Sequence, residues 1–149
     1  MTSNSQTPGQ LLFAKLEINL DEIPIEQLAD YTAVEYYLTV EDEPPPNATN
    51  LEKVRHYLEA FHHLCEVKDW NSAKTILLDR QIGSQLQTWS KYREMMNCYQ
   101  RLIGHLNALD EVTCNRGLGN AYFFLCIYPS FVTLGRGKVE IRVNQGYKN

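Results

Sequence analysis

The middle of the chain repeats apolar residues at intervals of three and four, and this pattern restricts the fold more than any other feature. The first such stripe follows Thr49 and Glu52, which stand at the spacing of a capping box. Intervals of three and four place side chains on one face of an α-helix. We therefore predict a helix from about residue 51 to Val67. Its stripe consists of Leu51, Val54, Leu58, Phe61 and Cys65.

Similar stripes predict further helices along the chain. Asp69 is expected to cap a short helix, and Asp110 to cap a later one that Pro129 ends. Residues 81–90 stay ambiguous, because Gly83 weakens their helical spacing. The sequence thus predicts an all-α fold of antiparallel helical hairpins, with at least four helices between residues 51 and 125. The stripes are Ala73, Ile76 and Leu77; Tyr92, Met95, Met96, Tyr99, Leu102, Ile103 and Leu106; and Val112, Leu118, Ala121, Tyr122 and Leu125.

The segments around this centre are less regular. Residues 1–43 are predicted to hold one helix, from Ile25 to about Leu38, and residues 12–20 fit either a strand or a helix. Residues 44–50 begin with three prolines and are predicted to be a linker. Residues 129–149 are predicted to form an irregular tail, although residues 138–143 alternate like a strand. The stripe of the first helix consists of Ile25, Leu28, Ala29, Thr32 and Tyr36.

Charge and composition exclude several classes of partner. The 149 residues carry a formal net charge of -4, which opposes binding to nucleic acid because phosphate neutralisation needs an excess of Lys and Arg. The longest apolar run, Ala121 to Tyr128, is far shorter than the about 20 residues that span a bilayer. The first ten residues lack a signal-peptide pattern, and the four cysteines form no closely spaced pair. We therefore expect a cytoplasmic protein with reduced cysteines and no membrane or nucleic-acid partner.

Residues 117–125 carry a resemblance to a known family. Gly117-Leu118-Gly119-Asn120-Ala121-Tyr122, followed by Phe124-Leu125, resembles the first helix of a tetratricopeptide repeat (TPR). An earlier unit, with Trp70 and Ala73 at its turn and second helix, is similar to the same hairpin. The resemblance covers residues 51–128 and implies a TPR-like α-solenoid. The repeat segments also resemble those of large bacterial multi-repeat TPR proteins, of which this chain would be a short or truncated piece.

The resemblance implies that the chain is a scaffold for binding another protein rather than an enzyme. The first helix of each TPR hairpin lines a concave groove, and a basic residue followed four positions later by Asn holds a peptide there. Such a groove would suit an acidic or carboxylate-ended peptide, since Arg donates charge-assisted hydrogen bonds to carboxylates. Gly119 is expected to let the second helix approach closely. The residues that the resemblance assigns to the groove are Arg55, Leu58, His62, Arg116 and Asn120.

Two alternatives to the peptide-binding scaffold remain. The chain could be a structural fragment of a larger repeat protein that self-associates through Phe123, Phe124 and Phe131. A small hydrolase with Cys65 and a histidine as its reactive pair is less favoured, because no third group or oxyanion site can be named. His62 and Cys65 are also too few for a zinc site, which takes four ligands. We therefore expect no cofactor and no metal.

Overall fold

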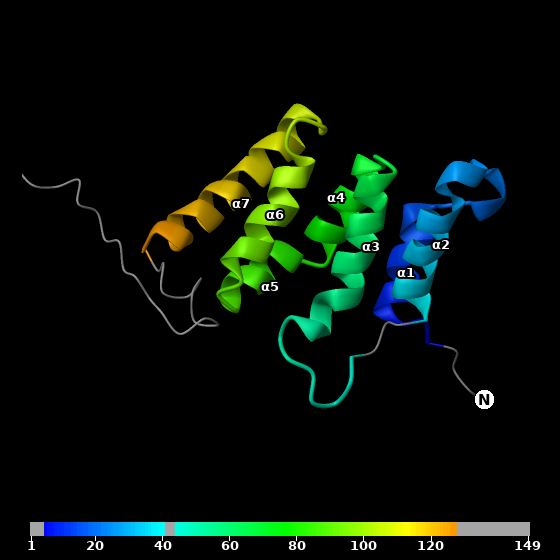
Figure 1. The fold of residues 1–149 in the computed structure, drawn as a ribbon, viewed down its shortest axis with the longest axis horizontal. Helices are drawn as coiled ribbons and strands as arrows, with labels where there is room; N and C mark the ends of the chain where they lie inside the picture. Colours follow the sequence, from blue (N-terminus) through cyan, green and yellow to red (C-terminus); the bar gives the residue numbers. More distant parts are fainter. Residues whose placement is uncertain (1–4, 41–43, 128–149) are drawn as a thin grey trace, which may run out of the picture.

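The computed structural model describes residues 5–40 and 44–127, and the part it describes is all-helical. The predicted tail and its strand-like residues 138–143 lie outside the described residues. The α-helices are α1 (Pro8–Leu16), α2 (Ile25–Thr39), α3 (Arg55–Glu66), α4 (Trp70–Asp79), α5 (Ile82–Thr88), α6 (Tyr92–Leu102) and α7 (Ala108–Ile127), and the 3-10 turns are η1 (Leu20–Glu22) and η2 (Glu52–Val54) (Figure 1). The prediction of an all-α fold is confirmed for the described residues. Of the two ambiguous segments, residues 12–20 run from the end of α1 into η1, and residues 81–90 contain α5.

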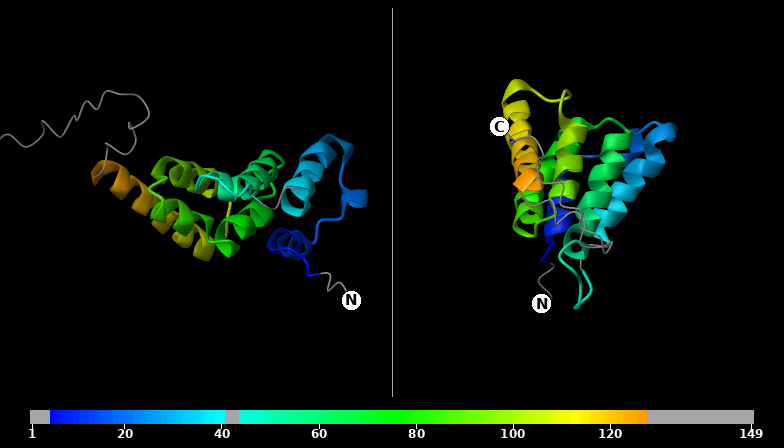
Figure 2. Two further views of the ribbon diagram at one scale, coloured as in Figure 1. Left: turned by 90° about the horizontal axis from the view of Figure 1, so that it is seen from below. Right: turned by 60° about the vertical axis from the view of Figure 1, so that its left-hand side comes forward.

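The helices form an elongated array of two layers. Figure 1 shows α1 and α2 at one end of the array and α7 at the other. The side view in Figure 2 places α2, α3 and α6 in one layer, with α1, α4 and α7 in the other. Helix pairs α1–α2, α3–α4 and α6–α7 pack across the layers, while α2 and α3 pack side by side.

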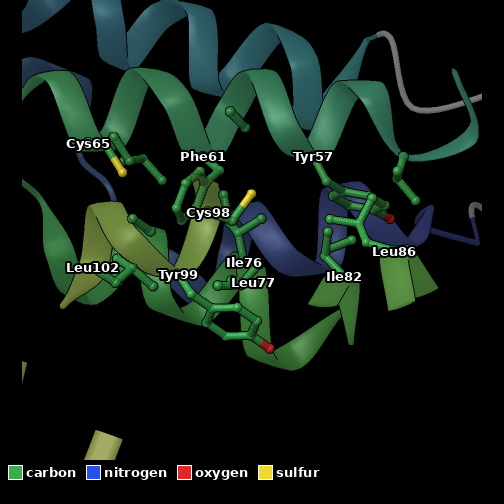
Figure 3. Packing of buried hydrophobic residues seen from close by; sticks show 14 of the residues in the cluster. Tyr57, Phe61, Cys65, Ile76, Leu77, Ile82, Leu86, Cys98, Tyr99 and Leu102 are labelled. Carbon is green, nitrogen blue, oxygen red and sulfur yellow. The ribbon is translucent and has the colours of Figure 1, made fainter. Parts of the chain in front are cut away.

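The core lies between the layers, where apolar side chains from all seven α-helices are removed from water. Leu38, Leu64, Ile76, Leu86 and Leu102 have less than 2 % of their surface exposed. Figure 3 shows core side chains of α3, α4, α5 and α6 that point toward one another, among them Phe61, Ile76, Leu86 and Leu102. Burial of one such side chain contributes about 1.5–3 kcal/mol, so this shared core stabilises the array as a single unit.

Capping groups fix several helix ends. Thr49 and Glu52 exchange the two hydrogen bonds of a capping box, and Asp69 Oδ1 accepts from Ser72 N at 3.1 Å, so both predicted caps are confirmed. Thr7 and Gln10 form a further capping box at the start of α1. The spacing of Thr7 and Gln10, with Pro8 at the first helical position, was a readable signal for α1.

The helix predicted from Ile25 is present as α2, but its buried stripe differs from the one that indicated the helix. Its buried residues are Tyr31, Val34 and Leu38, while Ile25 and Tyr36 are exposed. Both stripes repeat at intervals of three and four, so α2 is apolar on two faces. Helix α2 packs against α3, and Tyr31, Val34 and Leu38 form its buried stripe.

The turn between α6 and α7 also differs from the prediction. Helix α6 ends at Leu102 instead of near Leu106, because Ile103 is extended and Gly104 takes a left-handed φ of 90°. Glu111 Oε1 accepts hydrogen bonds from Gly104 N and Leu106 N and thereby satisfies backbone donors in this turn. Asn107 caps α7 in place of Asp110, since its Oδ1 accepts from Asp110 N at 3.0 Å.

Candidate interaction surfaces

The outer side of α7 exposes a row of apolar side chains together with one arginine. Leu109 is 76 % exposed, Val112 63 %, Phe123 59 % and Ile127 48 %. Intervals near three and four put them on one side of the helix. Arg116 and Asn120 are also exposed and lie between the two apolar groups. We call Leu109, Val112, Arg116, Asn120, Phe123 and Ile127 the α7 face.

The opposite side of α7 packs closely on α6. Cys114, Gly117 and Ala121 are its buried residues, and Tyr99 of α6 lies against Gly117. A methyl group at Gly117 would overlap the Tyr99 ring, whereas a methyl group at Gly119 would meet no atom of the described residues within 4 Å. Within the described residues Gly117, and not Gly119, permits close helix packing. The second helix predicted to pack against Gly119 would follow α7 and lies outside the described residues.

The buried stripe predicted for α7 was also partly wrong. Ala121 is buried and Leu118 packs against the core, but Val112 and Tyr122 are exposed. Tyr122 accepts a hydrogen bond from Gln100 of α6 at the surface. Helix α7 carries apolar residues on nearly every side, so its sequence alone could not identify the buried one.

Electrostatic contacts hold the first turn of α7 in place. Lys74 Nζ of α4 donates to Asp110 Oδ2 at 2.8 Å, and this bond is the main reason that the pKa of Asp110 is lowered. Glu111 accepts from the preceding turn, as described above. Both carboxylates of α7 are thus engaged at its start. Within the described residues no ion pair holds Arg116, which leaves its guanidinium available to a partner.

The predicted groove residues of α3 lie elsewhere in the array. Arg55 and His62 are exposed, while Leu58 is partly buried and packs against the core. His62 Nδ1 lies 2.6 Å from a guanidinium nitrogen of Arg101 on α6. Helix α6 stands between α3 and α7 (Figure 1), so the two predicted sets sit on helices separated by α6. Their joint role in one groove stays a prediction.

Polar contacts that the sequence analysis did not find join α2, α3 and α6. Arg101 donates to Glu66 Oε1 at 2.5 Å, which ties α6 to α3. Asp30 of α2 lies 2.8 Å from His63 Nδ1 of α3. These pairs link residues 33 and 35 positions apart, and no local pattern reveals such contacts. These two contacts hold α2, α3 and α6 beside one another in their layer.

The buried thiols and phenols are held in their protonated forms. Burial raises the pKa of Cys65 to about 11, of Cys98 to about 12 and of Cys114 to about 11. The pKa of Tyr31 is raised to about 12, first by burial and then by the Asp69 carboxylate. A neutral thiol is a weak nucleophile, so Cys65 is poorly suited to the reactive role considered for it.

Two hollows in the described surface lie at α1, away from the α7 face. One of about 450 Å³ opens between α1 and α2, and another of about 350 Å³ opens between α1 and the end of α4. Both are open to solvent. Among residues 5–40 and 44–127, no group of three or more His, Cys, Asp or Glu side chains is placed to hold a metal ion.

Comparisons with known proteins identify no relative of this chain. No family model, no curated protein and no solved structure matches the chain. No helix in the described part is both long and apolar enough to cross a membrane.

Proposed function

We propose that this chain is a protein-binding helical scaffold of the TPR-like α-solenoid type, which docks a partner on the α7 face. Two antiparallel hairpins, α3–α4 and α6–α7, support the solenoid interpretation, because they follow one another in the array and share one core. The short helix α5 between them is a departure from a regular repeat.

The observation that carries this proposal is the composition of the α7 face. Exposed apolar side chains grouped on one side of a helix and bordered by polar residues are a mark of a surface that meets another molecule. Phe123 and Ile127 supply large apolar anchors, and an arginine with no ion pair in the described residues lies about two to three turns away. Aromatic residues and Arg are the types that contribute most to protein interfaces.

The hydrogen-bonding groups of the α7 face indicate which chemical groups its partner carries. Arg116 and Asn120 are four residues apart, so their side chains lie side by side on the helix. Arg116 can donate two parallel hydrogen bonds to a carboxylate, and Asn120 can donate to and accept from a peptide backbone. The partner is therefore a protein segment with apolar side chains and at least one carboxylate.

Site-specific photo-cross-linking tests this function. A photoreactive residue at position 112 should cross-link a polypeptide in native cell extract, and Phe123→Ser should reduce the yield about tenfold or more. The matched control is the same photoreactive group at position 53, where Lys53 is exposed on η2. Equal yields from positions 112 and 53, or a yield that Phe123→Ser leaves unchanged, would contradict the proposal.

A further inference from the structure

Helix α2 exposes a second apolar row at the other end of the array. Ile25 is 76 % exposed, Val40 65 % and Tyr36 45 %, and Ala29 and Thr32 between them are exposed too. Their intervals of four, three, four and four keep them on one side of the helix. We call Ile25, Ala29, Thr32, Tyr36 and Val40 the α2 face. Such a face needs a covering partner as much as the α7 face does.

The end of the array that carries α2 is strongly acidic. Residues 5–40 contain six carboxylates and one lysine, Lys15, which is paired with Asp79 of α4. Glu22 and Glu26 flank the first turn of the α2 face and are exposed. Asp30 contacts His63. Three carboxylates near the apolar row have no ion pair among the described residues, and they are Glu22, Glu26 and the half-exposed Glu35. Three further acidic residues, at positions 41–43, follow α2 directly in the sequence.

The α7 face carries a charge of the opposite sign, on Arg116. Asp110 is paired with Lys74 and Glu111 caps a turn, which leaves Arg116 as the charged group of the α7 face. Residues 128–149, which follow α7, contain four basic residues and one acidic residue. Exposed carboxylates thus flank the α2 face while the α7 face carries a guanidinium, and complementary charge steers association and sets its orientation.

We propose that the α2 face of one copy binds the α7 face of a second copy. This inference rests on the proposed function, because it names the occupant of the α7 face. Glu22 and Glu26 would supply carboxylates for Arg116, and the apolar rows would cover one another. Since the two faces lie at opposite ends of the array (Figure 1), the contact is head-to-tail and leaves a free face at each end. A contact of this kind generates chains or rings instead of closed two-fold dimers.

The mass of the purified full chain in solution tests the contact. Light scattering at concentrations from about 1 μM to about 500 μM, with reductant to keep Cys126 from cross-linking, should show an average mass that rises with concentration. Ile25→Lys, which blocks the α2 face, and Phe123→Ser, which blocks the α7 face, should each raise the dissociation constant at least tenfold. Added salt should weaken the association, because the flanking charges are exposed.

An equimolar mixture of the two variants separates a head-to-tail contact from a symmetric one. One variant keeps an intact α7 face and the other keeps an intact α2 face, so the mixture should form a one-to-one dimer that grows no further. If either variant alone associates as strongly as wild type, the contact is symmetric or elsewhere and the proposal is overturned. Ala29→Lys and Val112→Ser repeat the test at other exposed positions, with circular dichroism to verify folding.

The outcome is distinct from that of the cross-linking experiment. A wild-type protein that stays monomeric over the whole concentration range, or an association that salt leaves unchanged, overturns the second-copy proposal. Cross-links from position 112 to another protein would still support the docking function. Loss of those cross-links together with a monomeric protein would remove both.

Discussion

Tyr99 lies between two glycines on different helices, and this contact determines how closely α6 approaches its neighbours. Gly83 of α5 faces the Tyr99 hydroxyl, and Gly117 of α7 faces the ring. In both places a methyl group would overlap the phenol, so the helices can pack at this distance only around glycine. Burial also raises the pKa of Tyr99, as expected for a phenol enclosed in the core.

Substitution of the two α7 glycines by alanine should have opposite effects. Gly117→Ala forces the Tyr99 ring to move and should lower the free energy of unfolding by about 1–3 kcal/mol. Gly119→Ala places its methyl group in open space on a helix and should raise the free energy of unfolding by about 0.5–1 kcal/mol. Urea unfolding measures both. Equal effects of the two substitutions would contradict the packing described for Gly117.

For individual residues of α7, the sequence could identify exposed positions better than positions in close contact with another helix. Arg116 and Asn120 are exposed as their positions around the helix suggested. Gly117 and Gly119 are two residues apart, and only the position of Tyr99, 18 residues earlier in the chain, distinguishes their roles. The TPR resemblance pointed to Gly119 and missed this long-range contact.

At the scale of elements, Asp69 joins a helix cap to a contact between helices. One carboxylate oxygen caps α4 by accepting from Ser72 N, and the other accepts from Tyr31 Oη of α2 at 3.0 Å. The carboxylate therefore fixes the start of α4 relative to α2. Charged acceptors make stronger hydrogen bonds than neutral ones, so both contacts should contribute measurably.

A double-mutant cycle separates the two contributions of Asp69. Asp69→Ala should cost about 1.5–4 kcal/mol, since it removes a cap and a buried hydrogen bond. Tyr31→Phe should cost about 0.5–3 kcal/mol, and the double variant should cost less than the two together. Asp69→Asn is the matched control, because Asn also caps helices. If the two single costs add fully in urea unfolding, the hydrogen bond between Tyr31 and Asp69 contributes nothing.

Local signals predicted the elements well and their faces poorly. Capping pairs such as Thr49 with Glu52 lie within one turn, so a short stretch of sequence contains the whole interaction. The face of α2 depends on α3, which follows after a proline-containing linker. Because α2 and α7 each present apolar residues on two sides, their periodicity predicted helices without showing which side is buried.

At the scale of the whole molecule, three thiols lie in one core and respond together to pH. Cys65, Cys98 and Cys114 are each less than 10 % exposed, and burial is the first cause of the rise in each pKa. An unfolded chain exposes the same thiols with an ordinary pKa near 8.5. Between that value and the raised values, the unfolded state therefore releases protons that the folded state keeps.

The fold should lose stability as the pH rises above about 8.5. A pKa that folding raises contributes stability that is fully present below the unfolded value and is lost toward the folded value, here about 11 to about 12. Each thiol adds a slope of up to about 1.4 kcal/mol per pH unit. Urea unfolding at a series of pH values measures the slope, and Cys98→Ala is the control that should flatten it. A free energy of unfolding that stays constant from pH 8 to pH 10 would show that these thiols titrate equally in both states.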